Sequence, residues 1–424
     1  MERDIFLPAD ILLYRGDDPT DFSVVACDQY TSEPDYWARV RARAEGRPSA
    51  YHLVFPELYL KEPDFDERIA SINAAMDACL RQGCFRECTG SLVYVERTLR
   101  GGKVRRGIVG KIDLEEYDYE KGSQSRIRAT EGTVLERIPP RVRIRENAPL
   151  ELPHVMLLAD DRERTVIEPI ATHRDRLELL YHFPLMEESG SLAGYLLPPE
   201  EQARIASALR ALAERDAFEE RYQIRGEGRS ILQFAVGDGN HSLATARKCY
   251  LQLKEQLGEE AARRHPARYA LVELVNLHDE SLEFEAIHRV LFGVQPEKVL
   301  AALEEAFELL DAPFPGAQEI TAITGSTERK LWIGNPTSQL AVGTLQAFID
   351  EYLAAFGGEV DYIHGEDVVR SLCGRADSIG FLLPRMDKND LFRTVILDGA
   401  LPRKTFSMGE ACDKRFYFEA RRIR

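Results

Sequence analysis

Residues 234–248, FAVGDGNHSLATARK, place a glycine-rich turn between an apolar run and a helix-forming stretch. The apolar residues up to Val236 predict a buried strand, and the residues after Ser242 predict a helix. A turn of this kind exposes backbone N–H groups at the positive end of the helix dipole. The stretch therefore predicts a strand, a turn and a helix that together can bind a phosphate or a carboxylate.

The polar residues of this turn suit that role. Gly237 and Gly239 allow the backbone to approach an anion closely. Asp238 can bind a metal ion or position a hydroxyl, His241 can donate to a phosphate or move a proton, and Ser242 can cap the helix or bind the anion. The alternative is a tight turn in which Asp238 and His241 satisfy only neighbouring backbone groups.

Other phosphate- and acyl-binding motifs are absent from the sequence. The string G-x-G-x-x-S lacks the third Gly or Ala of a dinucleotide fingerprint, and no acid ends the next strand. Neither a G-x-x-x-x-G-K-[ST] loop nor a G-x-S-x-G elbow occurs. The chemistry is therefore expected at the 237–242 turn itself.

Two further clusters contain acid, base and guanidinium groups. In EFEAIHRVL, Glu285, His288 and Arg289 lie within one helical turn or at the end of a strand. In IRATEGTV, Arg128 precedes Glu131, which is a candidate general base. For both clusters the alternative is structural, since a histidine near apolar residues is often a core residue and a turn acid is often only solvated.

The segment from Arg97 to Arg145 carries more basic than acidic residues. If its last part is extended, Arg141, Arg143 and Arg145 share one face, because side chains of a strand repeat every two residues. Such a face would bind an anion. The alternative is that these arginines pair with carboxylates elsewhere in the chain.

Other stretches predict regular elements. Residues 91–114 predict two strands around a Gly-Gly turn, and FRTVILD at 392–398 predicts a strand. One helix is expected to begin at Pro34 and another to end at Gly83.

The composition is that of a soluble globular protein with alternating strands and helices. The chain has 424 residues, 44% of them hydrophobic, and a net charge of −16, which argues against nucleic acid or an anionic membrane as partner. Seven cysteines without a hydrophobic leader indicate a reducing cytoplasm, and the thiols are expected to be buried rather than to bind zinc. We expect a mixed α/β fold in one interwoven unit, or two interwoven lobes at about 1–225 and 226–424.

Four stretches of the chain resemble motifs of the bacterial and archaeal protein family DUF1015. The Asp-Gly-His-His-Arg turn of that family is similar to DGNHS at 238–242, with Asn240 and Ser242 as the two substitutions. Its later motifs resemble the pair His288 and Arg289, and the string LPRKT that contains Lys404. Its upstream Arg-x-His-Glu-x-Thr string resembles RATEGT, residues 128–133. The resemblance covers nearly the whole chain.

The turn also resembles the box shared by ParB-like partition proteins, sulfiredoxins and an archaeal ADP-dependent serine kinase. That box holds nucleotide phosphates at a helix N-terminus, and its final arginine is replaced here by Ser242. Arg289, Arg128 or the face at 141–145 would then supply the guanidinium. The resemblance implies a strand–turn–helix phosphate site and a nucleotide, ADP or ATP, as its ligand.

These observations lead to the hypothesis of a phosphotransferase or phosphohydrolase that acts on a small metabolite. Asp238 would bind Mg²⁺, His241 would neutralise charge on the transferred group, and Glu131 would deprotonate the acceptor. The residues expected to bind substrate or phosphate are Gly237, Gly239, Asn240, Ser242, Arg128, His288, Arg289 and Lys404.

Two alternatives stay open at this point. One is a non-catalytic protein that binds a nucleotide or another anion and responds by a change of conformation. The other is a metal-dependent hydrolase whose ligands are Asp28, Asp238, His241 and His288.

Overall fold

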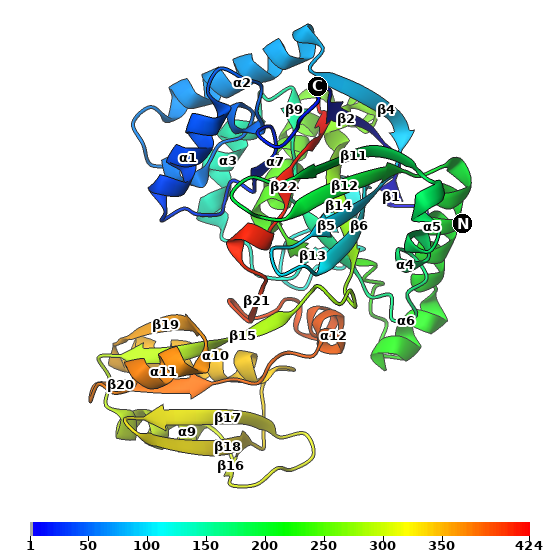
Figure 1. Cartoon of the computed structure of the whole chain (residues 1–424). Coiled ribbons are helices and arrows are strands. Elements are labelled where there is room, and N and C mark those ends of the chain that lie inside the picture. The colour runs from blue at the N-terminus through cyan, green and yellow to red at the C-terminus, as the bar shows by residue number, and fades with distance from the viewer. Residues whose placement is uncertain (1–2) are drawn as a thin grey trace. The chain divides into compact units, whose positions relative to one another are not determined.

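A computed structural model describes residues 3–424 and shows a mixed α/β protein, which confirms the predicted fold class (Figure 1). The chain divides into two compact units. The first contains the chain up to Leu282 together with Glu410–Arg424, and the second is Glu283–Gly409. Residue 225 lies inside the first unit. Within residues 3–424 no helix combines the length and the apolar character that crossing a bilayer requires.

The first unit is built on a sheet of ten strands (Figure 1). The strand order is β11(Glu178–Pro184), β12(Ser191–Leu196), β5(Val93–Thr98), β6(Val104–Asp113), β14(Tyr269–Asn276), β10(Met156–Ala159), β13(Phe234–Asp238), β8(Ile127–Ala129), β7(Tyr117–Asp118), with β1(Phe6–Leu7) on β6. The antiparallel strands β5 and β6 form the predicted hairpin around the Gly-Gly turn. β13 pairs in parallel with β8 and antiparallel with β10.

Two smaller sheets of this unit join the ends of the chain. The last strand lies between strands from the first hundred residues and the middle of the chain (Figure 1). The four-stranded sheet has the order β4(Phe85–Ser91), β2(Ala9–Tyr14), β23(Glu419–Arg422), β9(Leu150–Glu151), and the two-stranded sheet is β22(Phe416–Tyr417) with β3(Val24–Val25).

The helices of the first unit begin and end largely where the sequence predicts. The α-helices are α1(Pro34–Ala44), α2(Phe65–Gln82), α3(Ile138–Arg145), α4(Glu168–Ala171), α5(Pro199–Leu212), α6(Arg215–Tyr222), α7(Asn240–Leu257) and α8(Glu259–Arg264). Pro34 stands in the first turn of α1, and Gly83, in the left-handed region, ends α2. The short 3-10 helices are η1(Ala50–His52), η2(Glu57–Tyr59), η3(Leu114–Glu116), η4(Leu135–Arg137), η5(Arg174–Arg176), η6(Pro266–Arg268) and η7(Ala411–Asp413).

Helix α3 corrects the prediction of an extended arginine-bearing segment. Pro139 and Pro140 lie in the first turn of the helix, where a fixed φ favours the helix and no N–H is needed. The three arginines therefore do not share one face. Each is paired: Arg141 with Glu57, Arg143 with Asp66, and Arg145 with Glu151 at 2.5 Å. The alternative interpretation, pairing with carboxylates elsewhere, is the one the structure shows.

Helix α7 packs against one face of the large sheet, and both faces of that sheet are buried. Val93 and Val95 contribute to one core cluster, whereas Tyr94 between them contributes to the other, as alternation along a strand requires. Leu243 and Tyr250 of α7 belong to the same cluster as Tyr94. The start of α7 is thereby fixed against the sheet.

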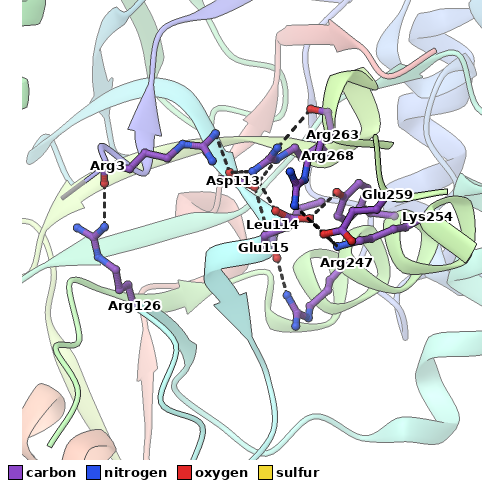
Figure 2. A network of polar contacts seen from close by, with 11 residues as sticks. Arg3, Asp113, Leu114, Glu115, Arg126, Arg247, Lys254, Glu259, Arg263 and Arg268 are labelled. Atoms are coloured by element: carbon purple, nitrogen blue, oxygen red, sulfur yellow. Dashed lines mark hydrogen bonds and ion pairs between the residues drawn. The ribbon is translucent and has the colours of Figure 1, made fainter. Parts of the chain in front are cut away.

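Ion pairs also attach α7 and η6 to the end of β6 and to η3, which follows it (Figure 2). The buried Asp113 accepts from Arg268 at 2.7 Å and pairs with Arg3 at 3.1 Å. Glu115 accepts from Arg268 and from Lys254 of α7, each at 2.9 Å. Much of the positive charge in this part of the unit is thus balanced within the protein.

The second unit contains a seven-stranded sheet and four helices (Figure 1). Its order is β16(Leu309–Leu310), β18(Thr327–Ile333), β17(Gln318–Thr324), β20(Ser378–Leu382), β15(Phe284–Phe292), β19(Glu359–His364), with β21(Phe406–Met408) on β15. The helices are α9(Pro296–Ala306), α10(Ala341–Phe356), α11(Glu366–Leu372) and α12(Lys388–Asp398). The run FRTVILD, expected to be a strand, lies in α12: Asp387 caps it, and its apolar side chains face the core at helical spacing.

Candidate functional site

The turn between β13 and α7 has the predicted strand–turn–helix form. β13 ends at Asp238, Gly239 adopts φ 79° and ψ 25°, and α7 begins at Asn240. A Cβ atom at Gly239 would lie 3.0 Å from the Cα of Val155, so the left-handed turn also passes close to neighbouring main chain. Glycine is required here by both conformation and space.

Several polar groups at the start of α7 have no partner among residues 3–424. No described residue accepts a hydrogen bond from the backbone amides of Asn240, His241 or Ser242, as expected for the first turn of a helix. The side-chain atoms Nε2 of His241 and Oδ1 of Asn240 are buried and also lack a partner. Buried polar atoms are nearly always bonded to protein, water or ligand, so this turn has donors and acceptors left for a ligand.

Asp238 is held by a lysine from the end of the chain. Its Oδ1 accepts from the Gly239 N–H at 2.9 Å, and its Oδ2 accepts from Nζ of Lys414 at 3.1 Å. Burial raises the pKa of Asp238, but Lys414, His154 and the Gly239 N–H together leave this pKa below its usual value. Lys414 is 176 residues away in sequence, and no sequence signal indicated it.

His154 lies beside the turn and joins three groups. Its Nδ1 is 2.7 Å from the Tyr417 hydroxyl, which also accepts from the Cys27 N–H at 3.1 Å. Its Nε2 is 3.2 Å from Oγ of Ser242 and 3.7 Å from Oδ2 of Asp28. The sequence did not indicate His154 and Tyr417 as site residues, because each is flanked by apolar residues and the pattern is typical of a buried strand.

His241 is positioned among cationic side chains. Burial, then the charges of Arg141 and Arg137, lower the pKa of His241 to about 4, while Asp28 opposes them. The imidazole is therefore neutral at pH 7. Arg137 is exposed, whereas Arg141 is engaged by Glu57.

Strand β8 brings the Glu131 cluster to the same edge of the sheet. Because β8 and β13 are parallel and Ala129 pairs with Val236, Asp238 at the end of β13 and Glu131 just after β8 lie at the same edge of the sheet. Thr130 donates from Oγ1 to the carbonyl of Val236 at 2.6 Å, which ties the two strand ends together. The ends of β8 and β13, which carry Glu131 and Asp238, therefore lie side by side in the first unit.

Arg128 is turned toward main-chain carbonyls. It is 3% exposed and donates to the carbonyl oxygens of Ser125 at 2.8 Å and Ser230 at 3.0 Å. Burial and the nearby Arg229 lower its pKa to about 10, which leaves it charged at neutral pH. These contacts hold two loops in place and use the guanidinium of Arg128, so Arg128 is not part of the proposed site.

His288, Arg289 and Lys404 belong to the second unit. His288 and Arg289 lie in strand β15 and so point to opposite faces. Nδ1 of His288 accepts from the Leu383 N–H at 3.2 Å, and the fully buried Arg289 donates to Oε1 of Gln346 at 3.0 Å. Lys404 has a positive φ of 54°. Contacts of these three residues with a phosphate remain predictions.

A cavity of about 150 Å³ adjoins the turn within the first unit. Ser242 and His154 line it, and ion pairs between Arg141 and Glu57 and between Arg145 and Glu151 form part of its wall. The rest of the wall is mainly apolar and includes Leu53, Phe55, Ile72, Met76, Leu150 and Leu243.

The described part of the chain, residues 3–424, contains no group of three or more His, Cys, Asp or Glu side chains placed to hold a metal ion. The cysteines there are all free thiols, two of them buried and five half-buried. Asp238 as a ligand of a nucleotide-bound Mg²⁺ ion remains a prediction.

Comparisons with known proteins give a family and several distant structural likenesses. A search of curated proteins found no match. A free serine kinase variant in complex with AMP has 11% identity and a TM-score of 0.39, covering 74% of this chain and 92% of the kinase. Truncated SbnI from Staphylococcus aureus has 11% identity and a TM-score of 0.35, covering 71% and 82%. A conserved hypothetical protein from Pyrococcus furiosus has 11% identity and a TM-score of 0.35, covering 76% and 96%.

These likenesses are too distant to assign an activity. The family model DUF1015, described as a protein of unknown function, matches residues 7–352, which confirms the resemblance to this family over that span. The chain therefore belongs to the DUF1015 family.

Proposed function

We propose that this protein is a phosphotransferase that binds a nucleotide, ADP or ATP, at the β13–α7 turn. One observation carries the proposal: the amides of residues 240–242, the unpartnered Nε2 of His241 and the ammonium of Lys414 gather at one helix N-terminus. Backbone donors, a helix dipole and a lysine are the groups that proteins use for phosphate oxygens. Phosphoryl transfer depends mostly on positioning and charge compensation, which this arrangement supplies.

In the proposed step the acceptor hydroxyl oxygen bonds to the terminal phosphorus of the nucleotide. The bond from that phosphorus to its bridging oxygen breaks, and the nucleotide leaves with one phosphate fewer. Glu131, at the neighbouring strand end, takes the hydroxyl proton. Lys414 and the α7 amides stabilise charge on the phosphate oxygens, and Asp238 orients Lys414.

Magnesium has a defined place in this proposal. Carboxylate oxygens and nucleotide phosphates are the ligands that Mg²⁺ prefers, and Asp238 is the carboxylate of this turn. Because Asp238 also accepts from Lys414, the metal and the lysine would share its oxygens. The assay is therefore run with and without Mg²⁺.

The test measures nucleotide binding by calorimetry and phosphoryl transfer by ³¹P NMR on the full chain. Lys414→Met should weaken nucleotide binding at least about tenfold, since charge-assisted contacts to phosphate contribute about 1.5–3 kcal/mol. Lys121→Met, an exposed lysine of the same unit, is the matched control and should bind normally. Glu131→Gln should bind nucleotide but transfer no phosphate.

Each contrary outcome has a defined meaning. Binding without turnover in the unmodified protein would favour the non-catalytic anion-binding alternative. Equal binding by Lys414→Met and Lys121→Met would remove the turn as the phosphate site. Activity that requires a stoichiometric transition metal, and no nucleotide, would favour the metal-dependent hydrolase.

A further inference from the structure

The cavity beside the turn has properties that the phosphate site does not explain. It is lined by residues of η2, α2, α3, α7, β9 and β14 in the first unit, and most of its wall is apolar. A cavity of about 150 Å³ is comparable with apolar protein cavities that bind a benzene-sized molecule. Its volume therefore suits a molecule of about ring size.

The charged side chains of the cavity wall form ion pairs with one another. Arg141 is paired with Glu57, and Arg145 is paired with Glu151, which also accepts from Arg421 at 2.8 Å. Bringing a charged ligand into such a wall would remove it from water without a free counter-ion, which is costly. The cavity therefore favours an uncharged guest.

The polar groups of the wall lie at the end of the cavity beside the β13–α7 turn, and most of their hydrogen-bonding capacity is already used. Oγ of Thr245 is committed to the carbonyl of His241 at 2.7 Å, and the Tyr417 hydroxyl is committed to His154 and to the Cys27 N–H. Oγ of Ser242, 3.2 Å from Nε2 of His154, retains capacity because a hydroxyl can donate once and accept twice. A guest with one hydroxyl can hydrogen-bond there while its apolar body fills the rest.

We propose that this cavity binds the acceptor of the phosphoryl group, an uncharged alcohol with an apolar body of about ring size. The inference rests on the proposed function, because Ser242 belongs both to the cavity wall and to the first turn of α7. The guest's hydroxyl would then lie beside the phosphate-binding amides, with Ser242 and His154 as its positioning residues. Free amino acids and other charged acceptors are excluded by the same wall.

Binding is tested on the full chain with benzyl alcohol, benzoate and free serine as probes. Benzyl alcohol should bind, and the two charged probes should bind at least about tenfold more weakly because the wall offers no free counter-charge. Ala246→Phe, which fills the cavity from α7, should abolish binding of benzyl alcohol, whereas Ala211→Phe on the exposed side of α5 should not. Ser242→Ala, which adds no volume, should weaken binding about tenfold.

Transfer is tested with a panel of neutral ring-sized alcohols and free serine, each with nucleotide and Mg²⁺, by ³¹P NMR. Phosphate monoesters of neutral alcohols are expected. Transfer to serine alone, or benzyl alcohol binding unchanged by Ala246→Phe, would overturn the inference while leaving the phosphate site intact. Alcohol binding without any nucleotide binding would instead refute the proposed function, and with it the assignment of the guest as acceptor.

Discussion

At the scale of single residues, the turn at 237–242 combines a backbone conformation that favours glycine with unused polar groups. His241 is the clearest case: its Nε2 is buried without a partner in the described chain, and burial, then nearby Arg141 and Arg137, disfavour its protonation. Such an arrangement destabilises the protein unless a ligand uses it. Lys414 completes the site from the C-terminal segment.

The depressed pKa of His241 predicts a pH-dependent stability. Its pKa is 6.5 when unperturbed and about 4 in the folded protein, so the unfolded chain binds more protons between these values. Stability should therefore fall as the pH drops from 6.5 towards 4. In urea unfolding, the free energy of unfolding of His241→Gln should fall by about 1–2 kcal/mol less over this pH range than that of the unmodified protein, after allowance for solvent screening. Equal losses of stability in the two proteins between pH 6.5 and pH 4 would contradict the assignment of this pH dependence to His241.

At the scale of elements, the start of α7 is defined by Gly239. Gly83 at the end of α2 is the natural comparison, because both glycines are left-handed but only Gly239 would place a Cβ against neighbouring main chain. Gly83→Ala should cost about 1 kcal/mol, the usual penalty of the left-handed region. Gly239→Ala should cost clearly more in the same urea unfolding experiment. Equal losses would show that the turn is not closely packed against Val155.

The strand–turn–helix unit was predictable because its signals are local. Apolar runs, glycines and prolines located β13, α7, α1 and the end of α2 correctly. Residues 392–398 and 141–145 were misassigned, since short apolar or alternating runs fit a strand and a helix equally well. Packing against the core makes residues 392–398 helical in α12, and the Pro139–Pro140 pair favours the helix α3 at residues 141–145.

At the scale of the whole molecule, the first unit depends on residues 410–424. These supply β22, β23, Lys414 and Tyr417, so the candidate site joins groups from both ends of the chain's sequence. His154, Lys414 and Tyr417 could not be predicted because their contacts span up to 390 residues. Only the pairing of strands brings them together.

The buried Arg415 tests this dependence. It is 4% exposed and pairs with Glu273 and, at 2.6 Å, with Glu419, both 1% exposed. Arg415→Met would leave the buried Glu419 without its counter-ion and Glu273 with only Arg105, at 3.7 Å, so we expect a loss of about 3–5 kcal/mol in the free energy of unfolding. Arg422→Met, which removes an exposed arginine of β23, should cost less than about 0.5 kcal/mol. Comparable losses would contradict the role given to the C-terminal segment.

A crystal structure of the full chain with bound ADP would show whether the β13–α7 turn holds phosphate. We expect phosphate oxygens within hydrogen-bond distance of the amides of residues 240–242 and of Nζ of Lys414. ADP bound elsewhere, with the Asp238–Lys414 pair and the α7 amides free of it, would contradict the claim.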